Sequence, residues 1–314
     1  MRVAVVGPGA IGGFVAAALA RSGVSVDVLA RGEHADAIER HGLQIESDLG
    51  SFTARVGVTR DLKAAGPFDY LLLTFKAHQW PQLLEHVAPF GGTGTMLATM
   101  QNGLPFWFVR EPPLRSVDPG GAIGAAFADS QTIGSVVHVS GHVVAAGRIR
   151  QSGGLRYVFG DPPGGTELAA GLVELFRRAG LAAEGDANVR ETVWLKLVNN
   201  VGLNAVSVLS GLTIKPMLAD RDAREMVRRL MTEALHVGQA MEVVGEVDVD
   251  ARIEYAARLD NVKTSMLQDY ENRRPLEIDP ILGAVRELGE RVGIATPQVA
   301  KTYAALVERT AANR

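Results

Sequence analysis

The sequence predicts an α/β protein in two parts, with a doubly wound parallel sheet in residues 1–186 and an all-helical domain in residues 187–314. Two observations predict this division. In the first half, short apolar runs with β-branched residues alternate with helical or loop segments, as in parallel β-α-β units. From residue 188 onward the apolar spacing is almost wholly helical. A chain of 314 residues with 47% hydrophobic content can bury two cores.

The first half opens with a strand, a turn and a helix. Residues 2–6 are an apolar run that ends in glycine, and residues 10–21 have helical spacing with small side chains. Further apolar runs predict strands at 24–30, 68–75, 95–101 and 181–184. The remaining predicted elements are a hairpin at 42–59, antiparallel strands within 136–160 and a helix at 166–179.

The second half is predicted as a series of helices with no strand between them. Their apolar spacing places them at 192–206, 217–243, 250–270 and 277–292. A last helix is predicted to begin with Thr296 as its cap and Pro297 as its first residue, because proline fits the first helical turn.

Composition excludes several classes of function. The formal charge of -3 and the absence of basic runs give no electrostatic footprint for nucleic acid or a membrane surface. The chain has no cysteine, so disulfides, thiolate metal sites and a cysteine nucleophile are excluded. The seven histidines show no metal-binding spacing, and glycines interrupt the apolar N-terminus where a signal peptide would need a continuous run. We therefore expect a cytoplasmic protein without a metal.

A glycine-rich turn follows the first predicted strand and opens the first predicted helix. Gly7, Gly9 and Gly12 have G-x-G-x-x-G spacing, and Ala10 and Ile11 lie between them. In this context the glycines permit a tight turn and let a pyrophosphate reach the N-terminus of the helix. The sequence thus predicts a Rossmann-type dinucleotide site, with a strand-helix turn that binds nothing as the alternative.

The end of the second strand bears on which dinucleotide is bound. Arg31 lies at its tip, where an arginine would accept the 2′-phosphate of NADP. Asp27 and Glu33 are acidic residues that could bind the ribose of NAD instead. Asp27 lies mid-strand among apolar neighbours, so we expect NADP, with an Arg31 that binds nothing as the alternative.

The stretch "TVWLKLVNNVGLNAV" at 192–206 carries polar residues within an otherwise apolar helix. At about 100° per residue, Lys196, Asn200 and Asn204 would fall in an arc of roughly 80° on one face. Asn199 lies off that line and is predicted to be a packing partner. The stripe faces either a substrate or water, which a snorkelling lysine would also reach.

Six ordered motifs now point to a family. "GPGAIGG", "LLLTFKAHQ", "MQNG", "WLKLVNNVGLNAV", "SMLQDYENRRPLEID" and "GIATP" run from one end of the chain to the other. In these motifs the sequence resembles the ketopantoate reductases (2-dehydropantoate 2-reductases). The resemblance implies NADPH-dependent reduction of a 2-keto acid, most simply ketopantoate in pantothenate biosynthesis, at a site between the two domains.

The resemblance also implies roles for individual residues. It makes Lys196 the catalytic lysine, and Asn200 and Asn204 substrate-binding residues. It implies that Ser265 binds the substrate carboxylate, although a serine at the start of a helical turn is as often a cap. Glu277 would contact the substrate or orient the lysine.

Three further residues acquire roles from the same resemblance. Asn102 would lie between substrate and nicotinamide, and Arg31 and Lys76 would flank the adenosine phosphate. The reaction itself favours such groups, because hydride transfer to a keto carbon leaves a negative charge on oxygen. A positioned ammonium such as that of Lys196 can stabilise this charge and deliver the proton.

Some residues depart from the family pattern. Phe106, Trp107 and Phe108 follow the "QNG" motif where relatives are polar, and Pro280 also differs. The aromatics either pack behind Asn102 or line a larger, more apolar pocket for a different 2-keto or 3-hydroxy acid. A dehydrogenase of the 3-hydroxyisobutyrate type and a non-catalytic nucleotide sensor remain alternatives, and a homodimer is compatible with the helices.

Overall fold

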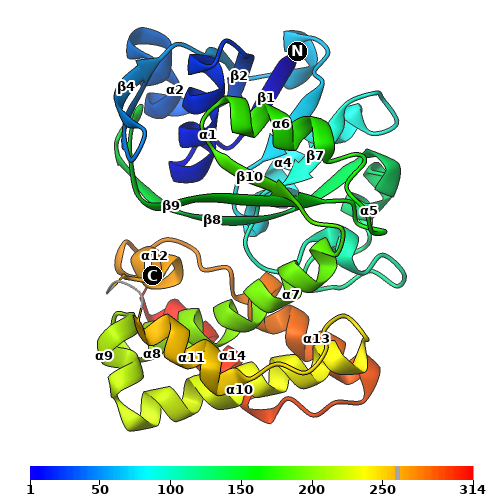
Figure 1. The fold of residues 1–314 in the computed structure, drawn as a ribbon, viewed down its shortest axis with the longest axis vertical. Helices are drawn as coiled ribbons and strands as arrows, with labels where there is room; N and C mark the ends of the chain where they lie inside the picture. The colour runs from blue at the N-terminus through cyan, green and yellow to red at the C-terminus, as the bar shows by residue number, and fades with distance from the viewer. Residues whose placement is uncertain (259–261, 314) are drawn as a thin grey trace. The chain divides into compact units, whose positions relative to one another are not determined.

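A computed structural model of the chain describes residues 1–258 and 262–313 (Figure 1). Contacts divide the chain into two compact units. Unit 1 contains Met1–Gln101 and Ala122–Arg190, and unit 2 contains Asn102–Gly121 and the chain from Glu191 onward. The division differs from the predicted boundary, which fell after residue 186 and placed residues 102–121 in the first domain.

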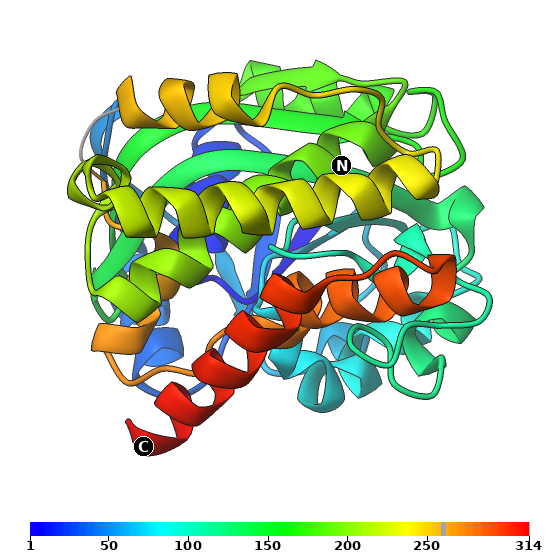
Figure 2. The same cartoon turned by 90° about the horizontal axis from the view of Figure 1, so that it is seen from below.

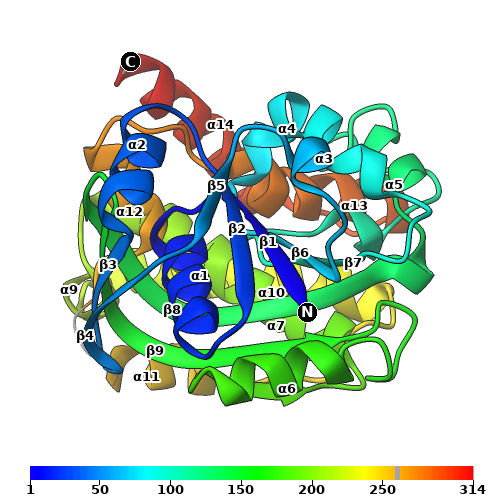
Figure 3. The ribbon, with the colours of Figure 1, turned by 90° about the horizontal axis from the view of Figure 1, so that it is seen from above.

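Unit 1 is built on a parallel sheet whose strands are β1 (Arg2–Val6), β2 (Ser25–Leu29), β5 (Gly57–Thr59), β6 (Tyr70–Leu73) and β7 (Met96–Thr99). In the described residues the strand order is β5-β2-β1-β6-β7, followed by β8 (Thr132–Ala145), which is parallel to β7. The helices of this unit are α1 (Ala10–Arg21), α2 (Gly32–His41), α3 (Leu62–Ala65), α4 (Trp80–Val87), α5 (Ala122–Ala126) and α6 (Ala170–Arg178). Figure 3 shows β1 and β2 side by side with α1 beside them.

The far part of this sheet is a long antiparallel pair, as predicted. β9 (Arg148–Gly160) pairs antiparallel with β8, and both strands curve past α1 in Figure 1. β3 (Leu43–Ser47) and β4 (Gly50–Ala54) form the predicted hairpin, and β3 adds to β9. The hairpin prediction was too long, because Gly57–Thr59 leaves it and pairs with β2 at the opposite edge. β10 (Ala182–Gly185) adds to β9.

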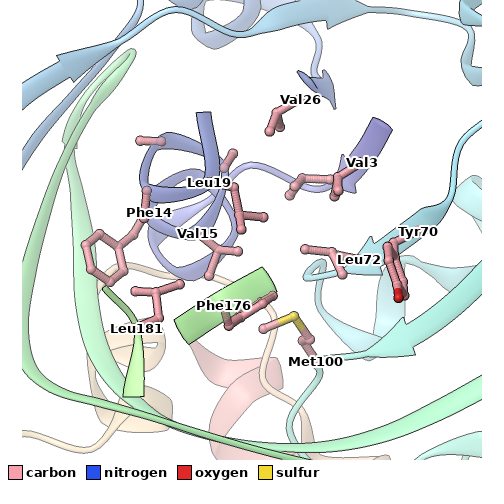
Figure 4. Packing of buried hydrophobic residues seen from close by; sticks show 14 of the residues in the cluster. Val3, Phe14, Val15, Leu19, Val26, Tyr70, Leu72, Met100, Phe176 and Leu181 are labelled. Atoms are coloured by element: carbon pink, nitrogen blue, oxygen red, sulfur yellow. The ribbon is translucent and has the colours of Figure 1, made fainter. Parts of the chain in front are cut away.

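The core of unit 1 lies where α1 and α6 meet the sheet (Figure 4). Phe14 and Leu19 of α1 are fully buried there, together with Phe176 of α6. Phe176 packs edge-on against the ring of Phe159 at 4.9 Å. α1 approaches β9 so closely that a Cβ atom on Gly13 would lie 2.2 Å from a side-chain carbon of Ile149. The small residues of α1 therefore permit the close packing of helix on sheet.

Outside segment 102–121, the regular elements of unit 2 are helical. Segment 102–121 itself contains the short 3-10 turn η3 (Phe106–Phe108). The longest helix of unit 2 is α10 (Arg221–Ala240), which packs against the helices α9 (Ile214–Ala219), α11 (Val249–Arg258), α13 (Ala284–Val292) and α14 (Pro297–Ala312), as seen in Figure 2. Its other elements are α7 (Val189–Asn199), η5 (Asn200–Asn204), α8 (Ala205–Ser210), α12 (Ser265–Glu271) and η6 (Asp279–Gly283).

Several predicted helices prove to be divided. The predicted helix 192–206 contains a π-helical turn, η5, between α7 and α8, and the predicted helix 277–292 begins with a second π-helical turn, η6. The predicted helix 250–270 is two helices, α11 and α12, and residues 259–261 lie outside the described residues. A single π-turn adds only one residue to a helix, and the apolar spacing on both sides of it still looks α-helical. Apolar spacing therefore does not reveal the π-turn.

The start of α14 confirms Thr296 and Pro297 as cap position and first residue. The Thr296 side chain makes no capping hydrogen bond. Instead, the carboxylate of Glu233 accepts from the backbone N–H groups of Gln298 and Val299 at 2.9 and 2.8 Å. A carboxylate from α10 thus satisfies the free N–H groups that open this helix.

Candidate functional site

The glycine turn of unit 1 is a tight connection between β1 and α1. Gly7 has φ +88°, and a Cβ on Gly12 would lie 2.1 Å from the hydroxyl of Thr74. That hydroxyl donates to the Gly7 carbonyl at 2.8 Å, a support that the sequence analysis missed. A Cβ on Gly9, by contrast, would meet no atom within 4 Å. Gly9 caps α1 without a side chain, so the N–H groups at the start of α1 are open to a pyrophosphate.

Arg31 lies just beyond β2, as predicted, and is exposed. Its Nη2 donates to His86 Nε2 at 2.5 Å. Asp27 is engaged elsewhere, because its carboxylate accepts from the guanidinium of Arg2 at 2.8 Å. The mid-strand carboxylate is therefore part of an ion pair, while Arg31 is exposed beyond the end of β2.

Lys76 follows β6 and precedes the short η1 turn (Ala77–Gln79). Its backbone N–H donates to the side chain of Gln79 at 3.0 Å. His34 of α2, which the sequence analysis missed, holds the glycine turn from another side. Its Nε2 donates to the carbonyl of Pro8 at 2.8 Å, and its Nδ1 accepts from the N–H of Gly147 at 3.1 Å. No sequence signal marks His34, because both partners are backbone atoms distant in the chain.

Asn102 and Glu277 of unit 2 both interact with Lys196. The ammonium of Lys196 donates to Asn102 Oδ1 at 3.0 Å across 94 residues of chain. Burial lowers the pKa of Lys196 from 10.5 to about 8, and the negative charge of Glu277 acts in the opposite direction. Glu277 is itself only 8% exposed. A lysine with a pKa near neutral pH and a defined hydrogen-bond partner is suited to proton transfer.

The two asparagines after Lys196 lie in the π-turn η5. Asn200 Nδ2 is buried and makes no hydrogen bond within the part of the chain that the structure describes. Such an amide donor costs free energy unless a ligand or solvent group pairs with it. Asn204 is 8% exposed. The four-residue spacing of Lys196, Asn200 and Asn204 therefore runs through a π-helical turn in its second half, and not through a continuous α-helix.

Asn199 confirms its prediction as a packing partner. Its side-chain oxygen accepts from Arg252 Nε at 3.2 Å, and the same guanidinium donates to the carbonyl of Leu195 at 3.1 Å. Arg252 of α11 therefore holds the end of α7, and burial lowers the pKa of Arg252. The lysine-bearing turn is fixed from outside by a second helix.

Ser265 is the exposed first residue of α12. The cap of this helix is its neighbour Thr264, whose hydroxyl accepts from the N–H of Leu267 at 3.2 Å. Thr264 also bonds to Ser207 of α8, with 2.5 Å between the two hydroxyl oxygens. Ser265 is thus not the side-chain cap of α12, and its hydroxyl stands at the surface of unit 2.

The aromatic residues that depart from the family pattern are buried. Phe106, Trp107 and Phe108 are 2 to 3% exposed. Phe108 stacks on Trp194 of α7 with ring centroids 5.7 Å apart. This contact supports the interpretation that the aromatics pack segment 102–121 onto the helix that carries Lys196.

In residues 1–258 and 262–313, no group of three or more His, Cys, Asp or Glu side chains is arranged to hold a metal ion. No helix in the same residues combines the length and the apolar character needed to cross a membrane.

Comparisons with known proteins agree over the whole chain. Two family models match, "Ketopantoate reductase PanE/ApbA" at residues 3–164 and "Ketopantoate reductase PanE/ApbA C terminal" at residues 188–309. A 2-dehydropantoate 2-reductase of Mesorhizobium japonicum is 38% identical, with 100% of this chain and 99% of the relative covered.

Solved structures share the fold. A 2-dehydropantoate 2-reductase of Geobacter metallireducens GS-15 superposes with a TM-score of 0.87 at 29% identity, covering 98% of this chain and 99% of that chain. A D-mandelate dehydrogenase with NADH and anilino(oxo)acetate superposes with a TM-score of 0.86 at 22% identity, covering 100% and 99%. The second likeness concerns the fold alone.

Proposed function

The chain belongs to the ketopantoate reductase family, and from this premise we propose that it reduces a 2-keto acid with NADPH, with 2-dehydropantoate as the favoured substrate. The observation that carries the proposal is the partly buried side chain of Lys196, whose ammonium is held by Asn102 and has a pKa of about 8. The product of this reaction, pantoate, would serve pantothenate and coenzyme A biosynthesis in the cytoplasm.

The residues of unit 2 are suited to the proton half of the reaction. When bound, the reduced nicotinamide supplies the hydride. The ammonium of Lys196 stabilises the negative charge that develops on the keto oxygen and then donates its proton to that oxygen. Asn102 fixes the direction of the ammonium, and the charge of Glu277 favours its protonated form.

Asn200 supports the assignment of a polar ligand at this site. Its buried amide donor lacks a partner in the described residues and would be satisfied by a carboxylate or hydroxyl oxygen of the substrate. An amide orients such a group without adding charge. We place Asn204 and Ser265 in the same substrate-binding role, from the family pattern.

The residues of unit 1 fit a dinucleotide. The turn at Gly7, Gly9, Ala10, Ile11 and Gly12 leaves the start of α1 open to a pyrophosphate. Arg31 would hold the 2′-phosphate that distinguishes NADPH from NADH, since the ion pair with Arg2 occupies Asp27. We assign Lys76 to the same phosphate end.

The first prediction concerns substrate and cofactor together. Oxidation of NADPH and of NADH should be followed at 340 nm with a panel of 2-keto acids that includes 2-dehydropantoate, pyruvate and aromatic keto acids. We expect the highest kcat/KM with NADPH and 2-dehydropantoate. A clear preference for NADH would contradict the role of Arg31.

The same panel tests the alternative substrates. Turnover confined to bulky aromatic keto acids would replace 2-dehydropantoate and would show that the aromatic residues after Asn102 shape a pocket. Oxidation of 3-hydroxy acids without reduction of any 2-keto acid would favour a dehydrogenase of another substrate class. Tight nucleotide binding without any turnover would favour a sensor.

The second prediction is a pH profile. Because Lys196 must be protonated to donate, kcat/KM for reduction should be level at low pH and should fall as the pH rises through about 8. Glu277 raises the pKa of Lys196, so Glu277→Gln should move this fall to lower pH. Steady-state rates between pH 6 and 10 measure both curves.

Glu308→Gln of α14 is the matched control, because it removes one carboxylate from an exposed position. It should leave the profile unchanged. If Glu277→Gln left the midpoint in place, Glu277 would have no electrostatic part in the proton transfer.

A further inference from the structure

Segment 102–121 begins with the residue that holds the lysine, and its next two residues touch η6. The N–H of Leu104 donates to the carbonyl of Pro280 at 2.7 Å. Gly103 has φ +82°, and a Cβ built on it would lie 2.7 Å from that carbonyl oxygen and 2.8 Å from the Pro280 Cβ. Any other residue at position 103 would therefore have to push the segment away from η6.

The turn η6, which contacts Gly103, also follows Glu277, whose charge acts on Lys196. Glu277 is buried just before η6 (Asp279–Gly283), and its charge raises the pKa of Lys196. The short turn η6 thus contacts segment 102–121, which begins with Asn102, and follows Glu277 closely in the chain. π-turns are frequently found at functional sites, where they re-aim backbone groups. Here the backbone carbonyl of Pro280 is aimed at segment 102–121.

We propose that Gly103 is a positioning residue, whose close contact with Pro280 of η6 fixes Asn102 against the ammonium of Lys196. The inference rests on the proposed role of Lys196 as proton donor. It assigns to glycine a function that no side chain could perform, since the contact requires both a positive φ and the absence of a Cβ.

The chain offers a matched pair of variants for the test. Gly120 lies in the same segment with φ +86°, but a Cβ on it would meet nothing within 4 Å. Gly103→Ala and Gly120→Ala therefore carry the same backbone strain, and only Gly103→Ala adds the collision with Pro280. We expect kcat to fall about 10²-fold in Gly103→Ala, as for a small misplacement of a catalytic group. In Gly120→Ala it should stay within about twofold of the parent.

A double-mutant cycle separates positioning from general damage. If Gly103 acts through Asn102, Gly103→Ala should have little further effect on kcat in an Asn102→Ala background. Gly120→Ala should give independent, additive effects. Additive losses for Gly103→Ala and Asn102→Ala, or equal losses in the two glycine variants, would overturn the proposal.

A measurement without turnover keeps this test apart from that of the proposed function. The pKa of Lys196 can be obtained from the pH dependence of its competitive labelling, read by mass spectrometry. Loss of the hydrogen bond to Asn102 should lower that pKa in Gly103→Ala and leave it unchanged in Gly120→Ala. If Lys196→Ala proved fully active, the proposed role of Lys196 in the reaction would fail. The labelling of Lys196 in the two glycine variants would still report on the positioning. An unchanged labelling pKa in Gly103→Ala would refute the positioning itself.

Pro280→Ala serves if Gly103→Ala does not fold. It keeps the carbonyl that accepts from Leu104 and the Cβ that faces Gly103, and it removes the ring closure that fixes the φ angle of the residue presenting them. We expect a smaller fall in kcat, again absent in the Asn102→Ala background. A fall that persists in that background would count against the proposal.

Discussion

Lys196→Ala is expected to lower kcat by about 10² to 10⁴ while the protein stays folded. The ammonium is the only group near Asn102 and Glu277 to which we assign both stabilisation of the oxyanion and donation of the proton. Its burial also costs free energy, as the lowering of its pKa to about 8 shows. Its removal relieves this cost but takes the cation away from Asn102 and Glu277, so we expect the two effects to offset and the melting temperature to change little. Single-turnover and steady-state rates, with thermal unfolding on the same samples, measure both effects.

Lys301→Ala is the control for this variant. Lys301 is exposed on α14 and takes no part in the proposed site, so its loss should leave kcat and the melting temperature unchanged. Unchanged kcat in Lys196→Ala would remove the lysine from the chemistry. Loss of activity with loss of the folded state would instead give Lys196 a structural role.

Trp194→Ala is expected to lower the free energy of unfolding by about 3 to 5 kcal/mol, the range for removal of a large buried aromatic. Trp194 is fully buried in α7, two residues before the lysine, and stacks on Phe108. Its ring nitrogen donates to the carbonyl of Ala234 at 3.2 Å. A Cβ on Gly238 of α10 would lie 2.0 Å from that nitrogen, so the ring lies against the backbone of α10. Urea unfolding followed by circular dichroism measures the loss.

Two further variants calibrate this result. Trp194→Phe keeps a ring in the cavity and should recover part of the loss, whereas Tyr255→Ala, at a side chain that is 68% exposed, should cost about 0.5 kcal/mol or less. A loss below about 1 kcal/mol in Trp194→Ala would mean that the aromatic cluster is not what holds segment 102–121 to α7.

Local sequence signals predicted the parts of this protein that depend on short-range physics. The glycine spacing identified the turn at the start of α1, because strand, turn and helix are contiguous there. The alternation of apolar runs predicted the parallel strands, and Thr296 with Pro297 marked the start of α14. Ordered motifs along the whole chain also predicted the ketopantoate reductase family, which the comparisons confirm.

Other predictions were incomplete because the deciding contacts are distant in the sequence. The hairpin predicted at 42–59 is shorter in the structure, because Gly57–Thr59 pairs with β2 at the opposite edge of the sheet. Thr264, not Ser265, caps α12. The π-turns of η5 and η6 are invisible to apolar periodicity, although they carry or adjoin most of the polar site.

The sequence by itself determined the two-part organisation, the dinucleotide turn and the identity of the polar residues on the lysine helix, because each is encoded in contiguous residues. Only the tertiary structure decided that segment 102–121 belongs with the helical unit, that Asn102 meets Lys196 and that Gly103 lies against Pro280. The reason is physical. These contacts join residues separated by about a hundred or more positions. Such pairs form only when the packing of buried aromatic side chains and hydrogen bonds between distant backbone groups bring the segments together.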